Sequence, residues 1–218
     1  MALAIFDLDN TLLAGDSDYL WGRFLVEKGI VDGEHYEREN ERFFAQYKAG
    51  QLDIFEFLRF SLAPLRQHPP KQLHQWRSEF LSSVISPLIT ESAIQLVQKH
   101  RDAGDTLLII TATNAFVTRP IAERFGIDHL IATEPETLNG HYTGDVDGEP
   151  SFREGKVNRL NDWLAENRQT LKDSWFYSDS HNDLPLLEQV DHPVAVDPDE
   201  KLIEVANTRH WPIMQLHG

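Results

Sequence analysis

Two aspartates, Asp7 and Asp9, follow a short apolar run near the start of the chain and are its first candidates for chemistry. Side chains two positions apart in an extended segment point the same way, so both carboxylates should face one place. Two neighbouring carboxylates repel each other and are costly to bury without compensation. A hard cation such as Mg2+, which prefers oxygen ligands, would compensate them. Taken alone, the pair is equally typical of two exposed loop residues after a strand.

Two later polar segments also follow apolar runs. One is Thr111 to Asn114 and the other is Asp179 to Asp183. In open parallel sheets, ligands bind beyond the carboxyl ends of the strands. We therefore expect these segments to meet Asp7 and Asp9 at one edge of a sheet.

Together these segments could perform phosphoryl transfer. Asp7 and Asp179 could ligate Mg2+, and Asp183 could do so directly or through water. A carboxylate of the first pair could also act as a nucleophile and form an aspartyl-phosphate. Thr111, between a strand and a helix N-terminus, suits a phosphate, and Lys156 at another predicted helix start would add positive charge. The alternatives are a threonine that only ends a strand and a solvated surface lysine.

The apolar runs alternate with helical patterns after residue 87. This order predicts a parallel sheet with helices on both faces. A β-hairpin is expected over 134–148, with Asn139-Gly140 at its tip, either on the pocket rim or covering a sheet edge. Pro120 should kink or restart the helix expected over 115–124. The expected strands cover 4–6, 106–111, 129–132, 175–177, 193–196 and 213–216.

A long segment without strand patterns separates the first strand from the rest. We predict helices from Asp16–Asp18 to Gly29, over 34–48, from Asp53 to just before Pro64 or Pro69-Pro70, and over 71–84. These helices indicate an inserted all-helical cap, residues 15–87. The core would then consist of residues 1–14 and 88–218.

Composition excludes several classes of protein. The 218 residues are 41% hydrophobic and 25% charged, the balance of a globular domain, with no apolar run long enough for a membrane span. The net charge of -15 argues against a nucleic-acid partner. Cysteine is absent, which excludes disulfides and thiolate zinc sites. No leader-like segment precedes the first strand, so we expect a cytoplasmic protein without a membrane partner. The composition does not indicate an oligomeric state.

Four motifs in order resemble those of the haloacid dehalogenase superfamily. They are Asp7-Leu8-Asp9-Asn10-Thr11, Thr111, Lys156 and Asp179-Ser180-His181-Asn182-Asp183. The helical insert resembles the cap of the phosphoserine-phosphatase-like branch. The resemblance implies an α/β fold, with a Rossmann-like parallel sheet core and an inserted helical cap. It also implies Mg2+ as cofactor and a small phosphorylated metabolite as substrate.

The resemblance also implies roles for single residues. Asp7 would be the nucleophile and a metal ligand, and Asp9 the general acid and then the general base. Phosphatase activity is favoured over dehalogenase activity, because Asp9 can protonate an alkoxide leaving group. The implied metal ligands are Asp7, Asp179 and the backbone carbonyl of Asp9. The implied phosphate-binding residues are Thr111, Ala112 and Lys156. Asn182 and Asp183 are implied to support the metal ligands and Lys156 without contacting the substrate.

Departures from the phosphoserine phosphatase pattern point to a different amine. Asp16 stands where those enzymes usually carry a longer glutamate for the substrate amine. Bulkier residues also replace glycines at 112–113 and at Ser178 and Ser180. The segments 111–114 and 151–156 look like a bacterial subgroup that includes histidinol-phosphate phosphatases. Histidinol phosphate is therefore favoured, phosphoserine is next, and a role in amino-acid biosynthesis is implied. An acidic, aromatic cap with groups such as Asp16, Trp21 and Glu39 would suit that substrate.

Two other functions stay open. The chain could be a phosphotransferase, or a phosphate-binding or signalling module without turnover. His181 is a possible acid or base, but we expect a surface or supporting position for it, because Asp9 can already fill that role.

Overall fold

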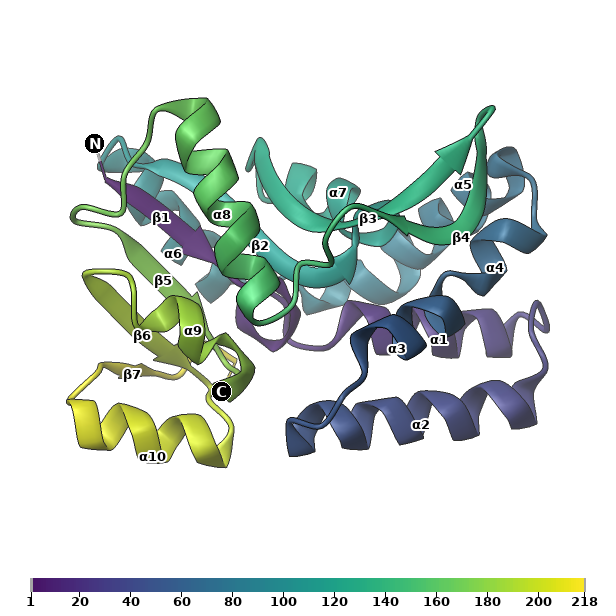
Figure 1. Cartoon of the computed structure of the whole chain (residues 1–218), viewed down its shortest axis with the longest axis horizontal. Helices are drawn as coiled ribbons and strands as arrows, with labels where there is room; N and C mark the ends of the chain where they lie inside the picture. The colour runs from purple at the N-terminus through teal and green to yellow at the C-terminus, as the bar shows by residue number, and fades with distance from the viewer. Residues whose placement is uncertain (1, 218) are drawn as a thin grey trace.

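The computed structural model describes residues 2–217, which form one seven-stranded sheet with helices on both faces (Figure 1). The strand order is β4-β3-β2-β1-β5-β6-β7. All neighbouring pairs are parallel except β3 and β4, as expected for strands joined by helical crossovers. The strands are β1 (Leu3–Phe6), β2 (Thr106–Asn114), β3 (His129–Leu138), β4 (His141–Asp147), β5 (Trp175–Ser178), β6 (His192–Val196) and β7 (Ile213–Met214). The predicted α/β fold is confirmed.

Side-chain alternation along β1 separates two apolar layers. Leu3 and Ile5 pack with the side that carries α8, α9 and α10, whereas Ala4 and Phe6 pack with the side of α6 and α7. All four side chains are fully buried. The core helices are α6 (Glu91–Asp102), α7 (Ala115–Arg124), α8 (Glu154–Asn167), α9 (Leu184–Leu187) and α10 (Glu200–Arg209). β1 is therefore the central buried strand, and the residues that follow it emerge in the middle of the sheet edge.

The inserted segment is helical, as predicted. Between residues 16 and 85, all of which the structure describes, no strand forms. The third helix ends before Pro64, the first of its two predicted ends, and an unexpected short helix begins at Ala63 with Pro64 in its first turn. Proline is tolerated in a first helical turn, where no intrahelical N–H bond is lost. The helices are α1 (Ser17–Glu27), α2 (Gly33–Ala49), α3 (Ile54–Ser61), α4 (Ala63–Gln67) and α5 (Pro70–Phe80).

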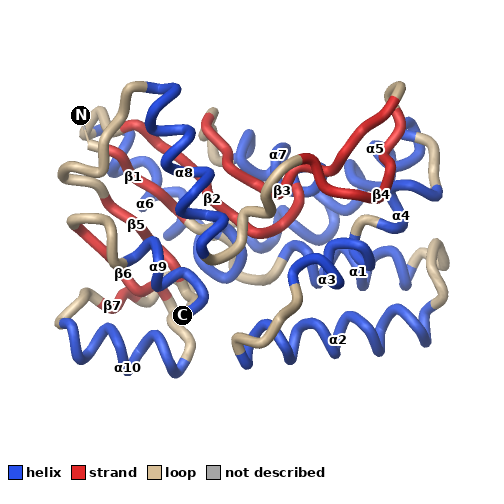
Figure 2. Tube along the Cα trace, in the orientation of Figure 1, coloured by secondary structure: helices blue, strands red, loops and turns tan. Residues whose placement is uncertain are grey.

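The predicted hairpin forms, but its first strand continues the sheet without a break. The separate short strand expected over 129–132 is part of β3. Asn139 and Gly140 take positive φ angles of 52° and 79° at the tip, which suits a tight hairpin turn. The hairpin extends from the sheet toward α3 and α4 of the insert (Figure 2), and the Cβ of a residue replacing Gly144 would lie 3.3 Å from Arg66. It covers the sheet edge and the insert, and contributes no residue to the pocket that contains Asp7.

Pro120 does not restart α7, which runs through it as one helix. Proline has no N–H, so the carbonyl of Phe116, four residues earlier, loses its helical partner. The guanidinium of Arg77, on α5, donates to that carbonyl at 2.7 Å. A side chain of the insert thus supplies the hydrogen bond that Pro120 cannot, and the helix stays continuous.

The insert and the sheet share one apolar cluster. Trp21 stacks on Phe24 and meets Phe80 and Phe116 edge-on or tilted, with ring centroids 5.2 to 5.9 Å apart. Leu13 and Ile89 form a bridge where the chain enters and leaves the insert. The division into a core (1–14 and 88–218) and a cap (15–87) therefore stays a prediction.

In the described part of the chain, no helix is both long and apolar enough to cross a bilayer.

Candidate active site

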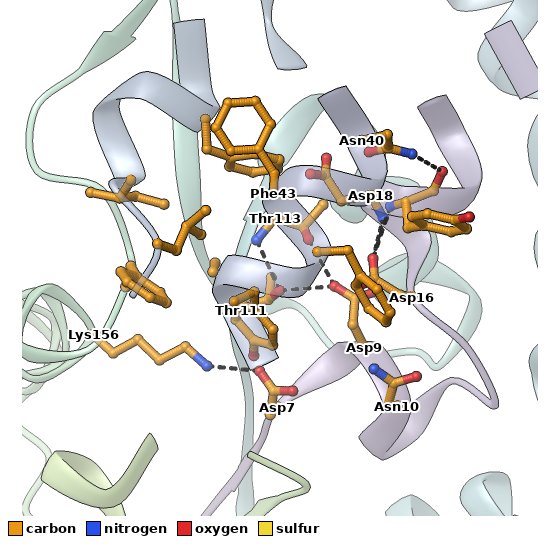
Figure 3. Close-up of a pocket in the computed structure, with 18 residues that line it drawn as sticks. Asp7, Asp9, Asn10, Asp16, Asp18, Asn40, Phe43, Thr111, Thr113 and Lys156 are labelled. Carbon is orange, nitrogen blue, oxygen red and sulfur yellow. Dashed lines mark hydrogen bonds and ion pairs between the residues drawn. The ribbon is translucent and has the colours of Figure 1, made fainter. Parts of the chain in front are cut away.

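The carboxyl ends of β1, β2 and β5 meet beneath the helical insert, as predicted. Asp7 and Asp9 follow β1, and the backbone at Asp9 is still extended, with φ -73° and ψ 131°. Both side chains reach one pocket between the sheet edge and the insert (Figure 3). The predicted site residues that line this pocket are Asp7, Asp9, Asp16, Thr111, Ala112 and Lys156. Asp179, Asn182 and Asp183 lie outside its lining, and Asp179 and Asn182 face a neighbouring cleft.

Lys156 joins two carboxylates below the pocket. Its ammonium lies 2.8 Å from Asp7 Oδ1 and 2.8 Å from Asp183. The hydroxyl of Ser178 donates to the same Asp183 carboxylate at 2.7 Å. Burial alone would lower the pKa of Lys156, but Asp183 and Asp7 outweigh burial and raise it. The lysine is therefore a fixed cation and not the solvated surface residue of the alternative reading.

Gly155 explains how α8 can begin so close to the site. A Cβ at this position would lie 2.2 Å from the carbonyl oxygen of Pro150, which real Cβ atoms do not approach so closely. Glycine therefore lets the chain turn tightly just before the lysine. This turn directs Lys156 inward, beneath the nucleophile candidate.

Asp7 and Asp9 have raised pKa values for different combinations of reasons. Burial raises the pKa of Asp7 to about 7, against the opposing effect of Lys156. Burial and the nearby Asp16 raise the pKa of Asp9 to about 6. The Asp9 carboxyl accepts from the backbone N–H of Ser17 at 2.6 Å and from the Thr113 hydroxyl at 2.8 Å. An acid with a pKa near the working pH, held in one orientation, can both donate and accept a proton.

The pair Asp7 and Asp179 has the features of a cation site. The Thr11 hydroxyl lies 3.4 Å from Asp7 Oδ2 and 3.3 Å from Asp179 Oδ1, and it accepts the backbone N–H of Asp179 at 3.0 Å. One hydroxyl proton cannot neutralise two carboxylates. Burial and Asp7 raise the pKa of Asp179 well above its ordinary value. A hard divalent cation with oxygen ligands fits this charge.

No three acidic, histidine or cysteine side chains in residues 2–217 are arranged as a complete metal cage. Mg2+ usually binds through one or two carboxylates and keeps several waters. Asp7 and Asp179 would hold it, with the backbone carbonyl of Asp9 as the remaining protein ligand. The residues present therefore fit the group that the motifs imply.

The residues behind the site connect it to the insert. Asn182 Oδ1 accepts from the guanidinium of Arg153 at 2.9 and 3.1 Å, and its amide donates to the backbone carbonyl of Tyr47 at 3.2 Å. His181 Nδ1 lies 2.7 Å from Asp199, and the ring lines the neighbouring cleft. As expected, the histidine occupies a supporting position away from the reacting groups.

The cap side of the pocket differs in part from the expectation. Asp16 lines the pocket, but one of its oxygens caps α1 by accepting the N–H groups of Asp18 and Tyr19 at 3.0 and 2.9 Å. Trp21 is buried in the shared apolar cluster, and Glu39 pairs with Arg42 outside the pocket. The expectation that Trp21 and Glu39 suit the substrate is therefore wrong, because packing and an ion pair occupy them.

Several residues of the site were not predicted to take part in it. Thr113 could have been found, because it lies two positions after Thr111 on one strand and so points the same way. Asp18 and Asn40 line the pocket only because α1 and α2 pack side by side. Arg153 takes a positive φ of 50°, which a sequence pattern does not predict for arginine.

The chain is similar to known proteins over most of its length. The family model of haloacid dehalogenase-like hydrolases matches residues 4–188. A histidinol-phosphatase of Neisseria meningitidis serogroup C (strain 8013) is 47% identical, over 97% of each sequence. A crystal structure of a protein of unknown function from Bordetella pertussis Tohama I has a TM-score of 0.93 and 46% identity, and covers 99% of this chain and 98% of its own.

A phosphoserine phosphatase, solved as an analogue of its phospho-aspartyl intermediate, has the same fold. Its TM-score is 0.73 at 20% identity, over 100% of this chain and 93% of its own. The family predicted from four motifs is therefore confirmed by a match that spans them all. This chain belongs to the haloacid dehalogenase-like hydrolases, in the branch that has the phosphoserine phosphatase fold.

Proposed function

We propose that this chain is an Mg2+-dependent phosphatase that hydrolyses histidinol phosphate through an aspartyl-phosphate, with phosphoserine as the next candidate substrate. The observation that carries the chemistry is the buried ion pair of Lys156 with Asp7 beneath a pocket that Asp9 also lines. The similarity to the Neisseria histidinol-phosphatase over 97% of both sequences supports the substrate. A cytoplasmic location and a role in amino-acid biosynthesis belong to the same proposal.

The first half of the reaction forms the acyl phosphate. An Asp7 carboxylate oxygen attacks phosphorus, and the bond from phosphorus to the ester oxygen breaks. Asp9 gives its proton to that oxygen, so the product leaves as an alcohol and not as an alkoxide. Lys156 balances charge on the phosphoryl oxygens and the Thr111 hydroxyl donates to them, since phosphoryl transfer depends mainly on positioning and electrostatics.

The second half regenerates the enzyme. Asp9, now ionised, takes a proton from a water that attacks the same phosphorus. The bond from phosphorus to Asp7 breaks, phosphate leaves, and Asp9 is again protonated. When bound, Mg2+ would neutralise the carboxylates and the phosphate so that they can approach each other. Thr113 and the backbone N–H of Ser17 keep the Asp9 carboxyl oriented through both halves.

Phosphate release from a panel of phosphorylated metabolites, with and without Mg2+, tests the proposal. The panel includes histidinol phosphate, phosphoserine and a phosphate ester of a neutral alcohol. We expect metal-dependent release that is fastest from histidinol phosphate. Release from none of them by a folded protein that binds Mg2+ would contradict the phosphatase. Added acceptor alcohols that receive phosphate would instead indicate a phosphotransferase.

A further inference from the structure

The end of the pocket away from Lys156 offers acceptors and no cation. Asp16 and Asp18, from the start of α1, and Asn40, from α2, face it (Figure 3). Among the described residues that line the pocket, Lys156 is the only basic side chain, and Asp7 and Asp183 already bind it. No free basic side chain of the pocket is therefore available to pair with the carboxyl groups on the cap side.

Asp16 and Asp18 differ in what they already bind. Oδ1 of Asp16 accepts two backbone N–H groups as the cap of α1. Asp18 receives one long hydrogen bond among the described residues, from the Asn114 amide at 3.4 Å. Burial and the neighbouring Asp16 and Asp9 raise the pKa of Asp18 well above its ordinary value. Asp18 is thus the carboxylate with free acceptor capacity, whereas Asp16 holds the helix that presents it.

Asn40 is oriented to add a second acceptor. Its Nδ2 donates to the backbone carbonyl of Tyr19 at 3.2 Å, which fixes the amide plane. Its Oδ1 accepts no hydrogen bond from residues 2–217. Gly22 makes this approach possible, since a Cβ there would lie 2.7 Å from Tyr36 and 3.1 Å from Asn40 Nδ2. Asn40 as a whole is 7% exposed and lines the pocket, and its Oδ1 keeps some accessibility, so this free acceptor favours a ligand with N–H groups.

Aromatic side chains form the wall between the two ends. They belong to α1, α2 and α3 and lie on the cap side of the pocket. Ring faces attract cations and flat, partly charged rings, which adds to the attraction of the carboxylates. The aromatic residues of this wall are Tyr19, Phe43, Phe44, Tyr47 and Phe57.

We propose that Asp18, with Asn40, binds the protonated nitrogen group of the substrate, and that Asp16 acts as a positioning residue for α1. The inference rests on the proposed function, because it places the phosphate at Asp7 and Lys156. It selects phosphate monoesters whose alcohol carries an amine or imidazolium group at the far end. It also moves the amine-binding role from Asp16, which the family resemblance indicates, to Asp18.

The test compares two esters and three proteins. The esters are histidinol phosphate and 2-phenylethyl phosphate, which has a ring but no nitrogen. The proteins are wild type, Asp18→Asn and the control Glu41→Gln, which removes one negative charge from an exposed position of α2 outside the pocket. The quantity compared is the ratio of kcat/KM for the cationic ester to kcat/KM for the neutral ester. We expect Asp18→Asn to lower this ratio by about 10- to 100-fold, the loss of a hydrogen bond to a charged group, and Glu41→Gln to leave it unchanged.

A binding measurement separates recognition from chemistry. Histidinol phosphate is titrated calorimetrically into Asp7→Asn and into the double variant Asp7→Asn/Asp18→Asn, with circular dichroism to verify the fold. We expect the double variant to bind about tenfold or more weakly. Asp18→Glu, which keeps the charge, should recover part of the ratio.

The outcomes distinguish this inference from the proposed function. An equal loss for both esters in Asp18→Asn, or no loss, overturns the role of Asp18 and leaves the phosphatase intact. A wild type that hydrolyses both esters equally well also overturns it. A wild type that releases phosphate from neither ester contradicts the proposed function instead.

Discussion

The two ends of the pocket solve the problem of buried charge in different ways. At the sheet end, Lys156 lies between Asp7 and Asp183, and Ser178 donates to Asp183 as well. At the cap end, Asp16 uses backbone N–H groups and Asp18 has almost no partner. The sheet end is therefore organised before substrate arrives, as electrostatic catalysis requires. The cap end is left for the substrate to complete.

Asp7→Asn should have the largest effect, because it removes the nucleophile from the organised end. We expect phosphate release to fall by roughly 10⁴-fold or more while the fold is retained. Initial rates measured with Mg2+, together with circular dichroism spectra, test this. Turnover at the wild-type rate would rule out an aspartyl-phosphate on Asp7.

Lys156→Met should lower both the activity and the unfolding free energy, because it removes the cation of the sheet end. Asp7 and Asp183 would face each other without a cation, and losing one partner of a buried pair costs about 3–5 kcal/mol of unfolding free energy. Activity should fall by about 100- to 1000-fold, since the positive charge that stabilises the transferred phosphoryl group is lost. Urea unfolding and initial rates measure the two effects, and Lys172→Met on the exposed surface is the control. An unchanged unfolding free energy would show that the buried pair contributes nothing net.

Arg153→Ala should weaken the attachment of the end of α2 to the residues at the sheet edge. The guanidinium donates to Asn182 and to the backbone carbonyl of Gly50 at the end of α2. We expect KM to rise by about 3- to 10-fold with a smaller change in kcat, and hydrogen exchange to quicken at residues 47–52, because a polar tether to a cap is lost. Lys71→Ala on the exposed face of α5 should change neither. Unaltered exchange at residues 47–52 would contradict a tether.

The smallest effect is the pH dependence of stability without metal. The pKa of Asp7 in the folded state is about 7, above its ordinary value of 3.8, so the folded state holds this proton more tightly. Stability from this group is therefore present at low pH and is lost as the pH rises through 7. The Tm of Asp7→Asn minus that of wild type should grow by about 2–5 °C between pH 5 and pH 8. Mg2+ should shrink the difference by binding folded wild type. A constant difference would contradict the raised pKa.

The sequence predicted the sheet end better than the cap end for a physical reason. Residues such as Asp7, Thr111 and Asp179 follow strands, and a parallel sheet brings strand ends together whatever the details of packing. Asp18 and Asn40 come together only through the packing of α1 on α2, and Trp21 and Glu39 looked equally suitable before that packing was known. Helix existence was predictable from apolar periodicity and caps such as Asp53, whereas the short α4 depended on Pro64 starting a helix.

The carbonyl that Pro120 leaves free has a mechanical consequence. It ties α5 to α7 through Arg77, beside the ring cluster of Trp21, Phe80 and Phe116. Separating these surfaces would expose aromatic area to water and leave a carbonyl unpaired. At the other side, the end of α2 is held by hydrogen bonds that water can replace, from Arg153, Asn182 and Lys201. We therefore expect the insert to stay attached to the core at α5 and to separate from it first at the end of α2. Substrate would then enter beside His181 and not past the hairpin.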